Sequence, residues 1–121
     1  MAALSEGFSR RARLTRPSEY QRVFKGRLKS SDAKLTVLGA GNDLDHARLG
    51  LAISRKVARR AVDRNRIKRI IRDSFRHRAQ CLGGLDIVVL GRRGIADLTN
   101  SELRETLEHH WKRLARRCER C

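Results

Sequence analysis

Residues 61–76 constrain the fold of this chain more than any other segment. Drawn as a helix, at about 100° per residue, the segment gathers a mainly apolar set within about one-third of the circumference. The set consists of Ile67, Ile70, Ile71, Ser74 and Phe75. A stripe of that width is typical of a helix that packs one face against a protein core, so the segment predicts a long amphipathic helix.

The opposite side of the same helix carries a row of long polar side chains. Asn65, Arg69, Arg72 and Arg76 recur at i, i+4, i+7 and i+11 and fall within about 60° of one another. We call these four residues the basic strip; Lys68 flanks it. Cations crowded along about 16 Å of helix repel one another unless they meet an anion. We therefore expect the strip to bind a polyanion.

The charge of the whole chain points to nucleic acid as that polyanion. Lysine and arginine number 29 against 13 acidic residues, which gives a formal net charge of +16 over 121 residues. Such a surplus attracts nucleic acid or an anionic membrane surface. A membrane partner is disfavoured, because no apolar run has the length of a membrane-spanning helix and the first residues lack the core of a signal peptide. The alternative to a polyanion partner is that these charges form only a solvated face with no ligand.

Length and cysteine content predict one domain in a reducing compartment. The 121 residues, 40% of them hydrophobic, suit a single core, with residues 1–14 a flexible basic N-terminus and residues 117–121 a frayed tail. Three cysteines, an odd number, argue against a disulfide framework. Cys118 and Cys121 lack the further ligands of a zinc site. We expect the cysteines to be incidental, the chain to hold no metal, and the protein to be cytoplasmic.

Three helices are expected. The first, over residues 17–26, should begin at a hydroxyl cap in residues 15–18 and end at its glycine. The basic helix should cover residues 58–79. The last should begin at a capping box made by Thr99 and Glu102, with Leu98 and Leu103 placed for a hydrophobic staple, and should bury Trp111.

Three strands are expected between the helices. Residues 34–40 and 47–54 read as strands that form an antiparallel hairpin across a Gly-Asn-Asp turn. Residues 85–90 read as a third, fully buried strand, preceded by a turn at Gly83 and Gly84. The order of elements predicts an α+β fold in which helices pack on a small sheet.

Three sequence motifs lie on or beside the expected helices and strands. The first is Arg64-Asn65-Arg66-Ile67-Lys68-Arg69, followed by Arg72, Phe75 and Arg76; the second is Arg13-Leu14 with Glu19-Tyr20-Gln21-Arg22-Val23-Phe24; the third is Arg48, Gly50, Ser54, Arg55 and Lys56. The first resembles the RNR signature of the bacterial ribonuclease P protein family, and the others match that family's remaining pattern. The resemblance covers residues 8–115.

Two residues depart from the family pattern. Tyr20 stands where phenylalanine is commoner, and Ala58 stands where many relatives have glycine. If the family backbone has a positive φ at residue 58, alanine costs about 1 kcal/mol there.

The resemblance implies a compact two-layer α/β sandwich. It would have three helices, a four-stranded sheet, one strand more than the periodicity predicts, and a left-handed strand-helix-strand crossover. It also implies an activity: endonucleolytic removal of the 5′ leader from precursor tRNA. In this family the catalytic centre belongs to the RNA subunit, which also binds the Mg²⁺ ions. The implied partners are ribonuclease P RNA and precursor tRNA, with no DNA and no membrane.

The resemblance further implies two groups of site residues. The RNA-subunit-binding residues would be Arg64, Asn65, Arg66, Lys68, Arg69, Arg72 and Arg76. The residues of a leader-binding cleft would be Tyr20, Phe24, Arg55 and Lys56. Without the family, spacing alone leaves two interpretations of Tyr20 and Phe24, since such an i, i+4 pair either packs in a core or forms a stacking platform for bases.

The residues independently favour a protein that binds RNA without cutting it. Phosphodiester hydrolysis requires a carboxylate–metal cluster or an acid–base pair, whereas the acidic residues here are scattered and the four histidines form no clear pair. A protein-only nuclease remains an alternative. A structural ribosomal protein, or another basic RNA-binding protein, would have similar size and charge. A DNA-binding helix-turn-helix is disfavoured because a strand, not a helix, precedes the basic helix.

Overall fold

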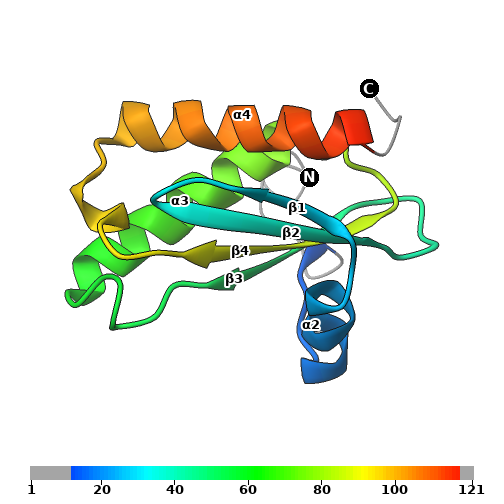
Figure 1. Cartoon of the computed structure of the whole chain (residues 1–121), viewed down its shortest axis with the longest axis horizontal. Coiled ribbons are helices and arrows are strands. Elements are labelled where there is room, and N and C mark those ends of the chain that lie inside the picture. Colours follow the sequence, from blue (N-terminus) through cyan, green and yellow to red (C-terminus); the bar gives the residue numbers. More distant parts are fainter. Residues whose placement is uncertain (1–11, 118–121) are drawn as a thin grey trace, which may run out of the picture.

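The computed structural model describes residues 12–117 as a four-stranded sheet with helices on both faces (Figure 1). The elements run in the order α2, β1, β2, β3, α3, β4, η2, α4. Their bounds are Pro17–Phe24 for α2, Leu28–Ser31 for β1, Leu35–Gly41 for β2, Arg48–Ala52 for β3, Ala61–Arg78 for α3, Leu85–Gly91 for β4, Ile95–Asp97 for the short 3₁₀ helix η2 and Asn100–Arg117 for α4.

The strands lie in the spatial order β1-β2-β4-β3. Antiparallel pairing joins β1 to β2 and β2 to β4, with Val37 opposite Val89, whereas β3 runs parallel to β4 with Leu49 opposite Ile87. The predicted hairpin of residues 34–40 and 47–54 is therefore wrong, because β4 lies between those two strands. Since β3 and β4 are parallel neighbours joined through α3, the chain contains the strand-helix-strand crossover that the family resemblance implied.

The main core lies between one face of the sheet and the helices α3 and α4. Ile67, Ile70, Ile71 and Phe75 are buried there, as the period of the sequence predicted. Trp111 of α4 is also buried, and its ring meets that of Phe75 edge-on with 6.0 Å between centroids. The Trp111 indole donates to Ser74 Oγ at 2.8 Å, which satisfies both buried polar groups.

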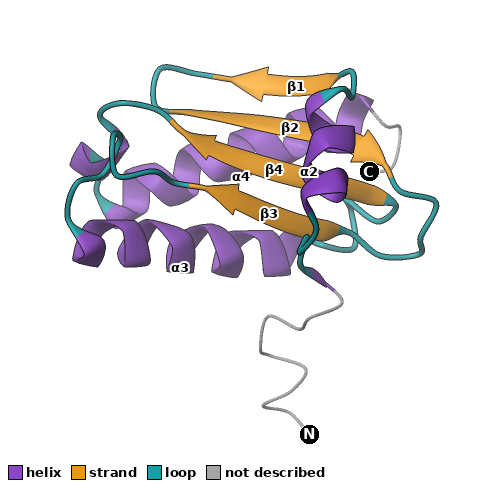
Figure 2. Ribbon diagram, turned by 90° about the horizontal axis from the view of Figure 1, so that it is seen from below, coloured by secondary structure: helices purple, strands orange, loops and turns teal. Residues whose placement is uncertain are grey.

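A second, smaller core lies on the opposite face, under α2 (Figure 2). Val23 of α2 is fully buried against Val88 of β4 and Leu14. The two-layer arrangement therefore describes the sheet with α3 and α4, while α2 adds a partial layer on the other side. This second face is left open beyond α2, and it forms the floor of the site described in the next subsection.

The flexible N-terminus predicted for residues 1–14 includes two residues that the structure holds in place, Arg13 and Leu14. Leu14 is buried and donates its backbone N–H to Leu49 O at 3.0 Å, and Arg13 forms a parallel bridge with Leu49. The remainder of that segment, residues 1–11, and most of the predicted frayed tail, residues 118–121, lie outside the described residues. Cys81 is disulfide-bonded, so the expectation that all three cysteines are incidental is wrong; Cys118 and Cys121 are outside the described residues.

The ends of the helices agree with the sequence in part. The capping box of α4 is confirmed: Glu102 N donates to Thr99 Oγ1 at 3.1 Å and Thr99 N to Glu102 Oε1 at 2.9 Å. The hydroxyl cap predicted for α2 is wrong, since Arg16 is its N-cap residue and Glu19 accepts the exposed backbone N–H of Arg16 at 2.9 Å. Ala58 has no positive φ, so its substitution for glycine carries no backbone strain.

Candidate nucleic-acid interface

The basic strip lies on the solvent side of α3. All four of its residues are exposed, while the isoleucines on the other side of the helix are buried. Within the described chain, Arg69 and Arg72 have no hydrogen bond or ion pair, whereas Arg76 pairs with Asp73 at 2.7 Å. The half-buried Lys68 lies beside the strip, toward the edge strand β3. The strip thus presents two unpaired guanidinium groups, which phosphate oxygens can engage in bidentate fashion.

Arg64 and Arg66 are placed differently from the strip. Arg64 Nη1 donates to the carbonyls of Ala58 and Arg59, both at 2.9 Å, and so holds the loop before α3. Arg66 donates to Ala96 O at 3.1 Å, to Leu98 O at 3.2 Å and to Asn100 Oδ1 at 2.8 Å. Both guanidinium groups are therefore engaged with the protein itself, although the family resemblance grouped them with the RNA-binding residues.

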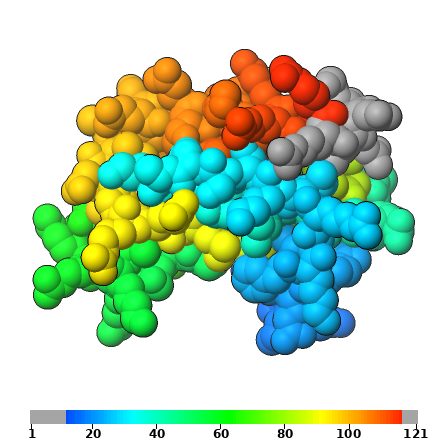
Figure 3. Space-filling model, viewed as in Figure 1, coloured from blue at the N-terminus to red at the C-terminus, as the bar shows by residue number. Residues whose placement is uncertain are grey.

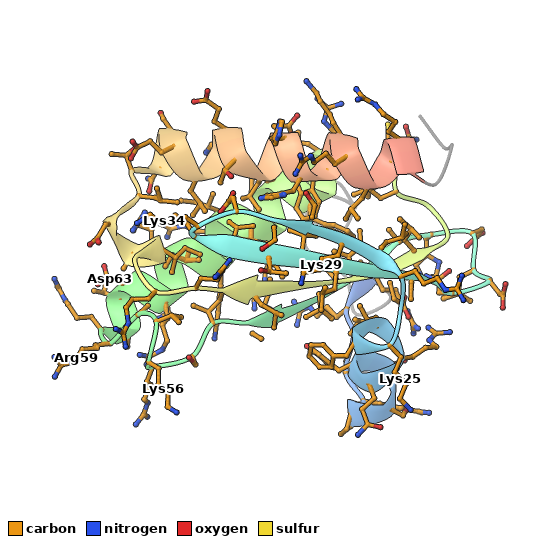
Figure 4. All side chains as sticks on the ribbon, viewed as in Figure 1. Lys25, Lys29, Lys34, Lys56, Arg59 and Asp63 are labelled. Atoms are coloured by element: carbon orange, nitrogen blue, oxygen red, sulfur yellow. The ribbon has the colours of Figure 1, made fainter. Side chains whose placement is uncertain are left out.

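A hollow lies on the face of the sheet that α3 and α4 leave open. In Figure 3 it separates the blue segment, which contains α2, from the green segment at the start of α3. Phe24 of α2 is 50% exposed on one side. Arg55 and Lys56 are exposed in the loop after β3 on the other side; Figure 4 shows Lys56 projecting to the same side of the sheet as α2, and Arg59 projecting away from α2.

The four predicted cleft residues thus lie on two walls instead of forming one cluster. The seven residues from Arg48 to Ser54 separate the walls along β3, which corresponds to roughly 20 Å of extended chain. Lys25, next to Phe24, and Arg59, in the opposite loop, are exposed cations that the motif did not include, although Figure 4 shows Lys25 on the side of α2 that faces away from that loop. A distance of this size between the two walls suits a ligand of several nucleotides.

Tyr20 lies deeper than Phe24, at the edge of the sheet. Its ring is half-buried against the second core, and its hydroxyl donates to Leu14 O at 3.4 Å. It lines a hollow of about 140 Å³ that also touches the flank of the basic strip. The lining residues are Arg13, Leu14, Tyr20, Leu49, Gly50, Leu51, Lys68 and Arg72. The two predicted surfaces, leader cleft and RNA-subunit face, therefore meet at Tyr20.

A buried carboxylate fixes α2 to the sheet. Asp86 of β4 is fully buried and accepts from Arg48 Nε at 2.8 Å, from Arg48 Nη2 at 2.7 Å and from Asn42 Nδ2 at 2.9 Å; Arg22 of α2 contacts its other side. Burial opposes ionisation, but the hydrogen bonds from Arg48, Asn42 and Arg22 and the charge of Arg48 outweigh it, so the pKa of Asp86 is lowered. Arg48 Nη1 also donates to Glu19 Oε2 of α2 at 2.8 Å.

A second polar cluster was not foreseen from the sequence. His110 of α4 is fully buried; its Nδ1 lies 2.5 Å from Ser30 Oγ and its Nε2 lies 2.7 Å from Asp32 Oδ2. The order serine, histidine, aspartate is that of a nucleophile, a base and an orienting acid. Here Ser30 is also buried, with 3% exposure, so no substrate reaches it. The cluster ties β1 and the following turn to α4, and no local sequence signal links residues 78 positions apart.

Several carboxylates of the described chain pair with arginines. Asp73 accepts from Arg76 and from Arg104 of α4, and Glu108 accepts from Arg78. Between residues 12 and 117, no group of three or more His, Cys, Asp or Glu side chains is arranged to hold a metal ion. None of the helices in that part of the chain has both the length and the apolar character needed to cross a membrane.

The chain is similar over most of its length to proteins of one family. Residues 8–115 match the family described as Ribonuclease P. The ribonuclease P protein component of Thioalkalivibrio sulfidiphilus is 50% identical over 116 residues, covering 96% of this chain and 97% of that protein. The corresponding protein of Methylococcus capsulatus is 51% identical over 112 residues, covering 93% and 88%.

Solved structures show the same likeness. The RNase P protein of Staphylococcus aureus superposes with a TM-score of 0.77 at 32% identity, covering 84% of this chain and 93% of that one. The RNase P protein of Thermotoga maritima gives a TM-score of 0.72 at 30% identity, with coverages of 84% and 96%. The mixed four-stranded sheet with three α-helices is therefore the fold of these proteins as well.

Proposed function

This chain belongs to the ribonuclease P protein family, and from that premise we propose that it binds two RNAs at once. One is the RNA subunit of ribonuclease P, and the other is the 5′ leader of precursor tRNA. By holding both, the protein promotes the endonucleolytic cut that removes the leader and gives the mature 5′ end of the tRNA.

The exposed face of α3 supports the contact with the RNA subunit. Asn65, Lys68, Arg69, Arg72 and Arg76 are the residues that we assign to this contact, and the observation that carries the assignment is the absence of any protein partner for Arg69 and Arg72 within the described chain. The planar guanidinium presents several donors in a fixed geometry, so arginine loses less entropy per hydrogen bond to phosphate than lysine does, and Arg69 and Arg72 need break no bond within the described chain to bind one. Arg64 and Arg66 contribute mainly by holding the loops at either side of α3.

The hollow beside α2 supports the contact with the leader. Phe24 offers an exposed ring on which a base can stack, and Tyr20 lies behind it. Arg55 and Lys56 supply charge on the opposite wall. Stacking on one wall and phosphate contacts on the other recognise an unpaired strand without reading a fixed sequence, which is what binding many different leaders requires.

The cleavage itself belongs, in this proposal, to the RNA subunit. Glu19, Asp73, Asp86 and Glu108 pair with arginines, and the buried positions of Ser30 and His110 keep substrate away from the Ser30–His110–Asp32 cluster. Mg²⁺ usually keeps several waters and is bound by phosphate oxygens together with one or two carboxylates. The phosphates of the RNA subunit suit this ion, and the described residues offer no group of three or more metal-ligating side chains, so we assign the Mg²⁺ ions to the RNA subunit and none to this chain.

Reconstitution tests the proposal. Purified protein is added to ribonuclease P RNA, and the cleavage of a precursor tRNA with a leader is followed at low Mg²⁺. We expect cleavage at the mature 5′ end when both subunits are present and none with the protein alone. Specific cutting by repurified protein alone would assign the chemistry to this chain. A protein that binds RNA but never promotes the cut would be a structural RNA-binding protein instead.

A further inference from the structure

Gly50 of β3 lies directly under the ring of Tyr20. Gly50 is buried on the face of the sheet that α2 covers, and a Cβ built on it would lie 2.7 Å from Tyr20 Cε2 and Cζ and 2.8 Å from the hydroxyl oxygen. Real side chains essentially never approach so closely. The φ of Gly50 is not positive, so the backbone itself would accept alanine. The glycine is therefore needed for space and not for conformation.

Arg48, two residues earlier in β3, reaches the neighbouring residue of α2. Alternate residues of a strand point to the same face, so Arg48 and Gly50 share the face that α2 covers. Arg48 Nη1 donates to Glu19 Oε2 at 2.8 Å, and its other donors hold Asp86 at 2.7–2.8 Å. The strand β3 thus contacts two consecutive residues of α2: the charged side chain of Arg48 binds Glu19, and the backbone of Gly50 lies against Tyr20.

We propose that Arg48 and Gly50 form a seat for α2, and that Gly50 is the positioning residue that sets the depth of the Tyr20 ring. This inference rests on the proposed contact of Tyr20 with the leader. At the observed depth the ring closes the small hollow beside Lys68 and Arg72, where the leader wall and the RNA-subunit face meet. A methyl group added at residue 50 would push the Tyr20 ring outward. The contact that the ring offers to RNA would then change, although no group that touches the RNA is removed.

The ring has few ways to accommodate a methyl group on Gly50. Behind it lie Leu14 and Val88 of the second core, and its hydroxyl is directed to Leu14 O. Movement further into the sheet is blocked by backbone, so the ring must rise toward solvent or carry α2 with it. Glu19, held by Arg48, resists the second movement. We expect the ring to rise and to become more exposed.

Gly50→Ala tests the seat, and Gly41→Ala is its matched control. Gly41 lies at the end of β2, also without a positive φ, and a Cβ there meets no atom within 4 Å. Tyr20 is the single tyrosine of the chain, so isotope-labelled tyrosine gives one set of ring signals by NMR. Line broadening by a soluble paramagnetic agent then reports how exposed that ring is. We expect greater broadening in Gly50→Ala and none beyond the wild type in Gly41→Ala.

The functional measurement uses the assembled holoenzyme. Gly50→Ala should weaken the binding of precursor tRNA by about 5- to 150-fold, the range of losing one stacked base, while the affinity for mature tRNA stays unchanged. In a Tyr20→Ala background the same glycine substitution should cause no further loss. A loss that persists without the tyrosine ring, or that equals the loss for mature tRNA, would mean that Gly50 supports the sheet in general and would overturn the proposal.

The NMR measurement separates this inference from the proposed function. If Tyr20→Ala alone leaves the preference for precursor tRNA unchanged, the assignment of Tyr20 to the leader fails. Increased ring exposure in Gly50→Ala still upholds the seat in that case. Unchanged ring exposure in Gly50→Ala overturns the seat, whatever the RNA-binding results are.

Discussion

Two arginines of the same helix should respond in opposite ways to replacement by alanine. Arg66 donates three hydrogen bonds, to Ala96 O at 3.1 Å, Leu98 O at 3.2 Å and Asn100 Oδ1 at 2.8 Å, and these join α3 to the segment before α4. Arg69, less than one turn further along, is exposed and makes no such bond within the described chain. Both substitutions remove one positive charge, so the pair separates a structural role from an electrostatic one.

Arg66→Ala should lower the free energy of unfolding by about 2 kcal/mol, since three partly exposed bonds from a charged donor are lost and water replaces part of them. Arg69→Ala should leave it unchanged, because an exposed arginine gives way to a good helix former. Urea denaturation followed by the fluorescence of Trp111, the single tryptophan, measures both values. Far-ultraviolet circular dichroism of the folded variants serves as the control for gross misfolding.

Binding to the RNA subunit should show the reverse pattern. Each lost phosphate contact makes the slope of log K against log salt shallower by about 0.7–0.9, so the penalty of Arg69→Ala should be about threefold larger at 50 mM than at 200 mM salt. Arg66→Ala should keep the wild-type slope. An Arg66→Ala protein of normal stability with a shallower slope would refute the reasoning and return Arg66 to the RNA-binding face.

Three further substitutions test the second face of the sheet. Asp86→Asn should cost about 3–5 kcal/mol at pH 7, since it removes the buried carboxylate to which both Arg48 and Arg22 are paired. Because the folded pKa of Asp86 is lowered, its stabilisation is present above the unfolded pKa of about 3.9 and is lost as the pH falls through the folded pKa. The variant should therefore show a weaker loss of stability below about pH 4 in acid titrations followed by circular dichroism. Val23→Ala should cost about 2 kcal/mol, because Val23 is fully buried, whereas Phe24→Ala, at a position 50% exposed, should shift the melting temperature far less; equal shifts would place Phe24 in the core.

The helices of this fold were largely predictable because their signals are local. The 3.6-residue period placed Ile67, Ile70, Ile71 and Phe75 in the core, and the spacing of Thr99 and Glu102 located the start of α4. The sheet was harder. The strand β1, Leu28–Ser31, is four residues long and mostly polar, and therefore has no hydrophobic alternation to detect. The order of strands depends on contacts between distant segments, so the turn signal at residues 41–43 suggested a hairpin that β4 prevents.

The candidate site shows the same division. Period alone identified the basic strip, and the structure places its four residues in solvent as expected. The helical period could not reveal that Arg64 and Arg66 donate to the protein, since all but one of their acceptors are backbone carbonyls, which carry no residue-specific signal. Similarly, nothing local indicated that Arg48 and Gly50 face α2, or that His110 meets Asp32. Which face a motif presents was predictable, but which partners its side chains find was not.

The preference of the holoenzyme for precursor over mature tRNA tests the central claim most directly. The ratio of the two affinities is measured at one salt and Mg²⁺ concentration, with Phe24→Ala and Arg72→Ala compared at saturating RNA subunit. We predict that Phe24→Ala lowers the ratio by about 5- to 150-fold, the range for one stacked base, and that Arg72→Ala leaves the ratio intact while weakening subunit assembly. An unchanged ratio in Phe24→Ala, or an equal loss of both affinities, would contradict the assignment of the α2 wall to the leader.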